Sequence, residues 1–265
     1  MATRATRPAT QLAAFVLHHY DWSESSLILD LFTREQGRQA VVAKGAKRPY
    51  SQMRAVLLPF QRLQVSLGKP PKAEAGEGAG EVQTLRAAEW AGGQAMLTGA
   101  ALFSGFYLNE LLMKLLARGD PHPALFDLYA QTLPALASAD ENDTQAALRA
   151  FEVLLLKAIG LLPDLGLVTL TQEDIRLDQH YAIRSEAGVT APRAGDAALS
   201  GPQLIGLQAA LEHGSLAALQ QACAPALPEL KAILRGLLHY HLGSPVLRTR
   251  QVMLDVQSLD RQLDR

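Results

Sequence analysis

Four cations are concentrated on one short stretch of the chain, VVAKGAKRPYSQMRAVLLPF, which begins and ends with apolar residues typical of strand ends. The stretch contains glycine and proline but no acidic residue, a composition typical of a connection. Its cations are Lys44, Lys47, Arg48 and Arg54. Cations on a connection can reach phosphate groups without disturbing a core, and each phosphate that they neutralise releases counterions. The chemistry indicated is binding of a nucleic-acid backbone without regard to its sequence.

Arginines and aromatic residues on either side extend this basic cluster. Arg34 and Arg38 flank the preceding turn, while Tyr50 and Phe60 could stack on unpaired bases. The alternative interpretation is an ordinary solvated loop, because most charge clusters simply lie in solvent.

The distribution of charge along the chain favours nucleic-acid binding over an ordinary loop. The net charge is −1, but residues 1–72 hold 11 Lys and Arg against 4 Asp and Glu. Residues 73–265 hold 14 against 22. Such asymmetry indicates contact with nucleic acid or membrane through the basic part, although the two parts could also merely attract each other.

Motifs for catalysis, cofactors or metals are weak or absent from the sequence. GEGAGE at residues 76–81 lacks the third glycine of a dinucleotide fingerprint, and its glutamates would repel phosphate. His18 and His19 are adjacent in an expected strand and so point to opposite faces. The single cysteine, Cys223, excludes a disulfide within the chain and a multi-thiolate zinc site. We expect no catalytic residue, no metal and no cofactor.

Five segments within the first 90 residues have the alternating or apolar pattern of short strands. They are Gln11–Trp22, Ser25–Thr33, Gln39–Lys44, Pro59–Leu67 and Val82–Trp90. In the fourth, Leu63, Val65 and Leu67 are expected to face inward. Five strands in so short a length predict a small antiparallel barrel, and the five-stranded OB-fold is the commonest such barrel that binds oligonucleotides. The Gly- and Pro-rich residues 68–81 are expected to form a mobile hairpin loop.

After Gly93 the apolar residues change to the period of helices. The expected helices lie at residues 102–116, 121–136, 143–159, 202–210, 215–222 and 228–242. Residues 163–200 are expected to be an irregular, cysteine-free insert with a short hairpin around Tyr181–Val189, and the tail Val246–Val256 has no clear period. The predicted fold class is therefore α+β, with a five-stranded OB-fold β-barrel at residues 1–90 and a mostly α-helical domain at residues 91–265.

The composition is that of a soluble globular protein. Hydrophobic residues make up 48% of the chain and charged residues 19%, and no apolar run is long enough to span a membrane. The N-terminal segment MATRATRPATQL is basic but lacks the apolar core of a secretory signal. We expect a cytoplasmic protein without membrane contact.

Several longer blocks of the sequence resemble one known family. AFVLHHYDWSESSLILDLFTREQGRQAVVAKGAKRP and LLPFQRLQVSLG are similar to the N-terminal barrel of the RecO recombination mediators. FYLNELLMKLL, FEVLLLKAIGLLPDL and HYHLGSPVLRTRQVM are similar to later blocks of that family. The resemblance covers nearly the whole chain in the right order, and the blocks are more specific together than singly.

The resemblance implies a bacterial, cytoplasmic and nucleoid-associated protein of DNA repair and homologous recombination, in the RecF pathway. It implies binding of single- and double-stranded DNA and annealing of complementary strands. From the residues themselves we expect no enzymatic activity. The implied partners are RecR, the C-terminal tail of the single-strand binding protein and, indirectly, the RecA recombinase. Many family members carry four cysteines in two pairs. The matching residues 162–202 contain none, so a structural zinc is not carried over.

The helical part offers two candidate slots for the tail of the single-strand binding protein, which is acidic with an apolar end. Such a tail needs an apolar slot beside a cation. The first candidate slot consists of Phe103, Phe106, Leu111, Lys114 and Arg118. The second consists of Arg149, Phe151, Leu154 and Lys157. In each helix the alternative is that the apolar residues are core and the cations extend from it.

The residues expected to contact DNA are Arg34, Arg38, Lys44, Lys47, Arg48, Tyr50 and Arg54. Two other functions stay open. An RNA-binding barrel would use the same physics, since the sequence shows no reader of the 2′-hydroxyl group. An enzyme with a hidden site, for example a hydrolase, would need clustered titratable groups with perturbed pKa values in a pocket.

Overall fold

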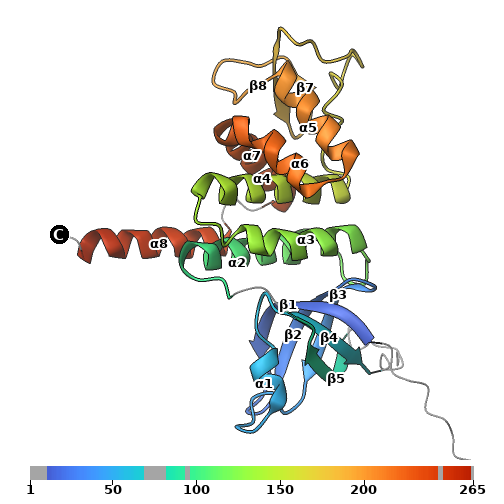
Figure 1. Cartoon of the computed structure of the whole chain (residues 1–265), viewed down its shortest axis with the longest axis vertical. Helices are drawn as coiled ribbons and strands as arrows, with labels where there is room; N and C mark the ends of the chain where they lie inside the picture. Colours follow the sequence, from blue (N-terminus) through green and yellow to red (C-terminus); the bar gives the residue numbers. More distant parts are fainter. Residues whose placement is uncertain (1–10, 69–81, 93–95, 244–246, 264–265) are drawn as a thin grey trace, which may run out of the picture. The chain divides into compact units, whose positions relative to one another are not determined.

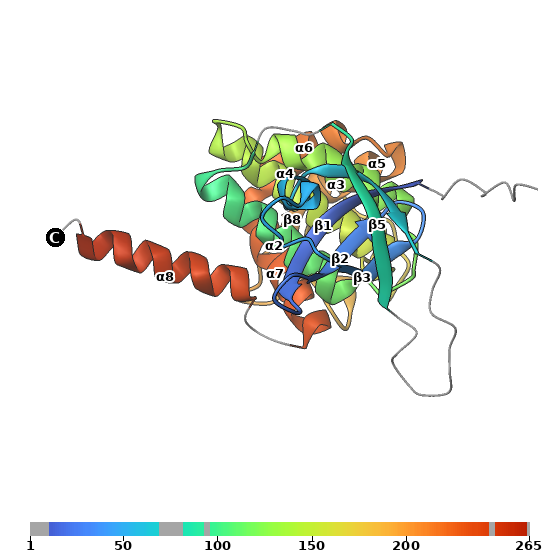
Figure 2. The same cartoon turned by 90° about the horizontal axis from the view of Figure 1, so that it is seen from below.

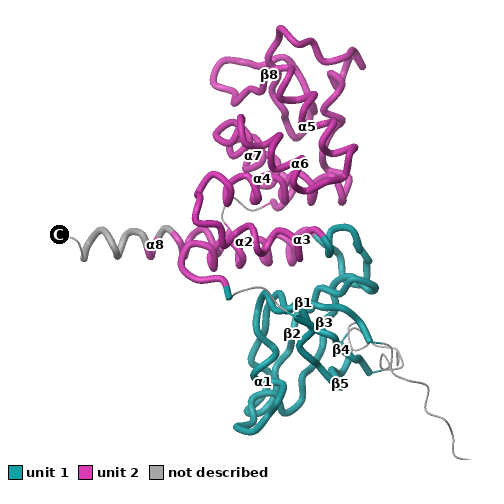
Figure 3. Tube along the Cα trace, in the orientation of Figure 1, with its two compact units in different colours: residues 1–96, 116–127 teal, residues 97–115, 128–265 magenta. Residues whose placement is uncertain are grey.

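The computed structural model of the chain describes residues 11–68, 82–92, 96–243 and 247–263, which form two compact units (Figures 1 and 3). Unit 1 contains residues 1–96 and 116–127, and unit 2 contains residues 97–115 and 128–265. The segment 116–127 is therefore distant in sequence from the rest of the unit that it joins. Most of the expected hairpin loop, residues 69–81, lies outside the described residues.

Unit 1 is built on a closed five-stranded barrel with the strand order β1-β2-β3-β5-β4. The strands are β1 (Gln11–Asp21), β2 (Leu27–Thr33), β3 (Gly37–Ala43), β4 (Arg62–Leu67) and β5 (Val82–Trp90). Neighbouring strands are antiparallel except β3 and β5, which are parallel (Figure 2). The helix α1 (Gln52–Val56) lies between β3 and β4 in the chain. This arrangement is that of an OB-fold followed by helices, so the predicted fold class is confirmed.

Alternation of apolar and polar residues produces the barrel core. Leu29 and Leu31 of β2 and Leu63 and Val65 of β4 are buried inside it, and Leu67 packs against it, as the sequence predicts. The helix α1 covers this core with apolar side chains where only an irregular connection was expected. The helix contributes Met53 and Val56, and Leu57 directly after it also packs in this core.

The segment Leu116–Asp127 covers part of the outer face of the barrel. The ring of Phe126 lies against Phe15 and Phe32, with centroid distances of 5.1 and 5.4 Å. A backbone amide of the segment also donates a hydrogen bond of 2.9 Å to the carbonyl oxygen of Arg38. Burial of three aromatic rings makes this segment part of the folded barrel unit.

Unit 2 consists mainly of helices and carries a small three-stranded sheet. Its helices are α2 (Gly99–Leu115), α3 (Pro123–Ala135, whose first turn belongs to unit 1), α4 (Glu141–Ala158), α5 (Gly201–His213), α6 (Leu216–Cys223), α7 (Leu227–Leu242) and α8 (Arg248–Leu263). A 3-10 turn, η1 (Ala224–Ala226), joins α6 to α7. The sheet, in the order β7-β6-β8, contains β6 (His180–Arg184), β7 (Gly188–Thr190) and β8 (Leu199–Ser200). β6 and β7 form the expected hairpin, and the tail without a clear period forms α8.

The start of α8 is held by a carboxylate of α2. Glu110, which is 6% exposed, accepts hydrogen bonds of 2.9 Å from the backbone amides of Arg248 and Thr249 and one of 2.7 Å from the Thr249 hydroxyl. Burial alone would raise the pKa of Glu110, but the hydrogen bonds from Thr249 and Arg248 outweigh it and lower the pKa. Because a negative charge is favourable at a helix N-terminus, Glu110 positions α8 and the side chains of its first turns.

Gly37 allows the covering segment to approach the barrel closely, and this contact can be tested. Its φ is +66°, and an added Cβ would lie 2.0 Å from the carbonyl oxygen of Asp120. Gly92→Ala is the matched control, since Gly92 has a φ of +87° but no atom within 4 Å of an added Cβ. Both substitutions cost about 1 kcal/mol for the backbone, and Gly37→Ala should cost about 1–3 kcal/mol more for the clash.

The measurement is urea unfolding followed by tryptophan fluorescence. Both tryptophans of the chain, Trp22 and Trp90, lie in unit 1 and report on it. Equal losses of unfolding free energy in the two alanine variants would show that the segment does not press on the barrel at Gly37.

Candidate nucleic-acid interface and basic pocket

The connection between β3 and β4, which includes α1, exposes most of the predicted DNA-binding residues. Lys44, Arg48 and Arg54 are exposed, and the ring of Tyr50 is 99% exposed. Phe60, in contrast, is 7% exposed, so its ring is unavailable for the stacking considered from the sequence. The connection therefore presents three cations and one aromatic ring to solvent.

Lys47 fastens this connection to the one between β1 and β2. Its Nζ atom lies 3.0 Å from a carboxylate oxygen of Asp21 and donates a 3.1 Å hydrogen bond to the carbonyl oxygen of Ser23. Its backbone amide donates to the carbonyl oxygen of Ser25 at 3.0 Å. The charge of Lys47 is thus partly neutralised, and its contacts bring the two connections together.

Arg34 is engaged by an acidic residue of the covering segment. Its guanidinium donates two hydrogen bonds of 2.9 Å to the two carboxylate oxygens of Asp127. The hydrogen bond from Arg34 lowers the pKa of Asp127, and the nearby charges of Arg34 and Arg62 act in the same direction. The same pairing raises the pKa of Arg34. Arg34 is therefore a paired cation at the surface, with 43% of its side chain exposed.

Arg38 is buried, which corrects its assignment as a DNA contact. It is 8% exposed, and its guanidinium donates to a carboxylate oxygen of Asp30 at 3.1 Å and to the carbonyl oxygen of Leu116 at 2.8 Å. A phosphate contact would leave Asp30 as a buried charge without this partner, which is strongly unfavourable. Arg38 is a structural residue of unit 1, and we withdraw it from the interface.

Two exposed aromatic residues beside the cations were missed by the sequence reasoning. Tyr20 is 49% exposed near the end of β1, and Trp22 is 66% exposed just beyond it. The signal that could have found them is the aromatic-rich HHYDW at the end of the first strand, directly before a turn.

The first candidate slot for the acidic tail is not assembled as predicted. Leu111 is fully buried, and Lys114 lies 3.5 Å from Glu110. Arg118 belongs to unit 1, where its guanidinium lies 3.9 Å from Asp30. Phe106 and Phe103 are partly buried on α2. Of these residues, Phe103 lines a cavity that also contains Arg149.

The second candidate slot is also only partly formed. Phe151 is fully buried and Leu154 is partly buried on α4, so Phe151 belongs to the core. The Nζ atom of Lys157 donates a 2.9 Å hydrogen bond to the carbonyl oxygen of Leu211. Arg149, however, lines the same cavities as residues from three other helices.

A basic pocket in unit 2 contains one residue from each candidate slot, Arg149 and Phe103. Its main cavity of about 330 Å³ lies among α2, α4, α7 and α8. The main cavity is lined by Tyr107, Arg149, Glu152, Lys231, Arg235, Leu238, His239, Leu247, Arg250 and Met253. A second cavity of about 160 Å³ shares five of these residues and adds Phe103, Ser104, Gln145, Leu148 and Thr249. The cations of α7 and α8 were not predicted, because they are distant in sequence from Arg149.

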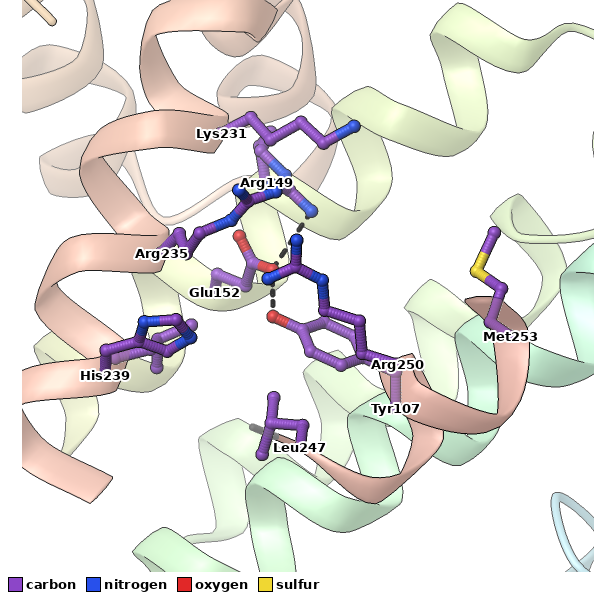
Figure 4. Close-up of a pocket in the computed structure, with 10 residues that line it drawn as sticks. Tyr107, Arg149, Glu152, Lys231, Arg235, His239, Leu247, Arg250 and Met253 are labelled. Atoms are coloured by element: carbon purple, nitrogen blue, oxygen red, sulfur yellow. Dashed lines mark hydrogen bonds and ion pairs between the residues drawn. The ribbon is translucent and has the colours of Figure 1, made fainter. Parts of the chain in front are cut away.

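Four cations and one carboxylate line the main cavity, so it is positively charged. Glu152 lies 3.0 Å from Arg149 and accepts a 2.5 Å hydrogen bond from the Tyr107 hydroxyl (Figure 4). Burial raises the pKa of Glu152 against the opposing effect of Arg149. Burial also raises the pKa of Tyr107, which keeps its hydroxyl protonated as the donor. Among the described residues, Lys231, Arg235 and Arg250 form no ion pair with Glu152, so the cavity retains positive charge for an anionic ligand.

The described residues show no site for nucleophilic or metal chemistry of the kind considered from the sequence. Burial raises the pKa of the Cys223 thiol to about 12, so it is not a thiolate at neutral pH. Among these residues no group of three or more His, Cys, Asp or Glu side chains could hold a metal ion. The helices in the described ranges include none that is long and apolar enough to cross a membrane.

Comparisons with known proteins match both units of the chain to one family. A family model described as "Recombination protein O N terminal" matches residues 9–90. A second model, described as "Recombination protein O C terminal", matches residues 96–251. The chain is 54% identical to the DNA repair protein RecO of Verminephrobacter eiseniae (strain EF01-2), over 93% of this chain and 96% of that protein. It is 50% identical to the DNA repair protein RecO of Polaromonas sp. (strain JS666 / ATCC BAA-500), over 96% of this chain and 100% of that protein. The chain therefore belongs to the RecO family of DNA repair proteins.

Proposed function

We propose that this RecO family protein is a non-catalytic recombination mediator that binds single- and double-stranded DNA through its barrel and anneals complementary strands. The observation that carries this proposal is the exposed set of Lys44, Arg48 and Arg54 on one connection of an OB-fold. These cations, unlike Arg34 and Arg38, have no ion pair with an acidic side chain among the described residues. They are available for phosphate.

The mechanism of annealing follows from charge. Two complementary strands repel each other through their phosphates, and cations held near both strands screen this repulsion. Backbone contacts carry no sequence information, so any complementary pair can be brought together. Phosphate binding at one connection therefore supports annealing without a nucleotide or a metal.

A second part of the proposal concerns the basic pocket of unit 2. We infer that it binds the C-terminal tail of the single-strand binding protein, which is acidic with an apolar end. Lys231, Arg235 and Arg250 can pair with carboxylates, while Leu238 and Met253 can contact the apolar end. Residues 73–265 are net acidic, so the attraction must come from this local group of cations.

The wider role follows from family membership and from these two sites. The protein would act in the bacterial cytoplasm on the nucleoid, together with RecR, and would help to load RecA on DNA coated by the single-strand binding protein. The pocket would recruit the protein to coated DNA, and the barrel would engage the strand beside it.

The barrel assignment predicts a specific loss in the double variant Lys44→Glu/Arg48→Glu. Lys47 is kept because its contacts support the connection. Affinity for single strands should fall for all sequences alike, and the slope of log K against log salt should flatten by roughly 0.7 per lost phosphate contact. The measurement is fluorescence anisotropy of labelled DNA at several salt concentrations, with an RNA competitor of matched sequence. Strand-annealing rates should fall in parallel.

The control for overall charge is Arg176→Glu/Arg193→Glu, which changes the net charge equally at exposed positions of unit 2. It should leave the salt slope of DNA binding unchanged. The barrel interface is rejected if Lys44→Glu/Arg48→Glu keeps the wild-type slope. Stronger competition by RNA than by unlabelled DNA would instead indicate an RNA-binding protein.

The pocket assignment predicts that Arg235→Glu weakens binding of a synthetic acidic peptide with an apolar C-terminal residue. Loss of one charge-assisted hydrogen bond should reduce affinity by about tenfold or more. Lys157→Glu is the matched control, because Lys157 lies on α4 of the same unit but does not line the cavity. The measurement is isothermal titration calorimetry, with DNA binding of each variant as a test of folding. Wild-type peptide affinity in Arg235→Glu would show that the tail binds elsewhere.

A further inference from the structure

Residues paired across β1, β2 and β3 divide the outer face of the barrel into a covered half and an uncovered half. In the covered half Phe15 pairs with Phe32, and Phe32 pairs with Arg38. The segment Leu116–Asp127 contacts all three residues, which are between 0% and 8% exposed. DNA cannot reach this half of the face.

The uncovered half lies toward the other ends of the same strands. Tyr20 pairs with Ile28 on β2, and Ile28 pairs with Val42 on β3. Val42 pairs in turn with Thr84 on β5. The side chains on either side of Ile28 and Val42 in sequence point into the barrel core, so this row points outward. Tyr20 is 49% exposed, and the other three residues are partly exposed.

Trp22 is a second exposed aromatic residue just past the end of β1. Its indole is 66% exposed, and it lies two residues beyond Tyr20, where the chain enters the connection to β2. The rings of His18 and Tyr20 meet edge to face, with a centroid distance of 4.5 Å. We call Tyr20, Trp22, Ile28 and Val42 the platform. Tyr20, Ile28 and Val42 lie at one end of the outer face, and Trp22 lies on the connection that directly follows β1.

Cations lie beside the platform. Lys44 directly follows β3, and Arg48 lies on the same connection, and both are exposed. Lys47 ties this connection to the one that carries Trp22, through its ion pair with Asp21 and its hydrogen bond to a backbone carbonyl. Aromatic surface and positive charge are therefore neighbours, as in sites that bind single-stranded nucleic acids.

We propose that the platform binds unpaired bases of single-stranded DNA by stacking on Tyr20 and Trp22, while Lys44 and Arg48 hold the phosphates of the same strand. The inference rests on the proposed DNA binding by the barrel and adds where on the barrel the bases of the DNA would bind. Ligands of OB-folds commonly use the face of strands 2 and 3 and the loop between strands 1 and 2. In this chain the covering segment closes one half of that face and leaves the half that carries the platform.

Stacking on the platform would suit an annealing protein. It uses the faces of the bases, so their Watson–Crick edges stay free for a complementary strand. Every base has such a face, so the contact tolerates any sequence. Bases in a duplex are already stacked on one another, so the platform selects single strands, whereas Lys44 and Arg48 bind phosphates of both forms.

The fluorescence of Trp22 can report directly on stacking. The variant Trp90→Phe leaves Trp22 as the only tryptophan of the chain. Titration with oligo(dT) should quench this fluorescence, while a duplex of equal length should bind with little quenching. Quenching to the same extent by both forms of DNA would overturn the proposal, because a duplex offers no unpaired base.

A second measurement separates the bases from the phosphates. Tyr20→Ala/Trp22→Ala should weaken binding of single strands by about tenfold or more, with an unchanged salt slope and unchanged duplex affinity. Tyr20→Phe/Trp22→Phe should restore most of the single-strand affinity, since it restores the aromatic rings.

Each other outcome counts against the platform. Wild-type single-strand affinity in Tyr20→Ala/Trp22→Ala would reject it and favour a protein partner for these rings. An equal loss of affinity for single strands and for duplex would show that the two rings support the structure of the connections and do not bind bases. With either outcome, Lys44→Glu/Arg48→Glu would still flatten the salt slope if the barrel binds DNA. Failure of the platform can therefore be distinguished from failure of the proposed DNA binding.

Discussion

The buried guanidinium of Arg38 is the interaction on which the arrangement of unit 1 depends. It joins Asp30 of β2 to the carbonyl oxygen of Leu116, at the start of the covering segment. Asp30 is 4% exposed, and a buried carboxylate without a partner would cost several kcal/mol. The need to neutralise Asp30 therefore helps to fix the segment over one half of the outer face. The half that remains open is the half available to a ligand.

The basic pocket of unit 2 also contains a buried carboxylate that is paired with a cation. Glu152 is 1% exposed and engages Arg149, and the Tyr107 hydroxyl satisfies one of its oxygens. The other pocket cations, among them Arg235 and Arg250, form no ion pair with it among the described residues. In both units a cation near the core holds an acidic residue, while cations at an accessible surface remain for anionic partners. Burial sets Arg38 and Arg149 apart from the cations left for anionic partners, whereas Arg34 is paired with Asp127 although it is partly exposed.

The fold could be predicted largely from the sequence, but the division of cations into two roles could not. Inward-facing residues such as Leu63 and Val65 repeat every second position, and this local period is sufficient to predict the strands of the barrel. Asp127, the partner of Arg34, lies 93 residues away, and Leu116, which accepts a hydrogen bond from Arg38, lies 78 residues away, so no local pattern reveals these contacts. The basic pocket was hidden for the same reason, because Arg149 meets cations from helices much later in the chain.

Annealing demands that a protein bind the separate strands well and then release the duplex. Phosphate contacts alone serve the first need but not the second, because a duplex presents more phosphate charge than either strand. The proposed stacking would supply the missing difference, since a base on Tyr20 or Trp22 would have to leave the ring to join a duplex stack. A barrel that combines Lys44 and Arg48 with the platform would therefore lose part of its affinity as pairing proceeds. The covered half of the face would support this balance, because it would limit the number of bases that the protein holds at once.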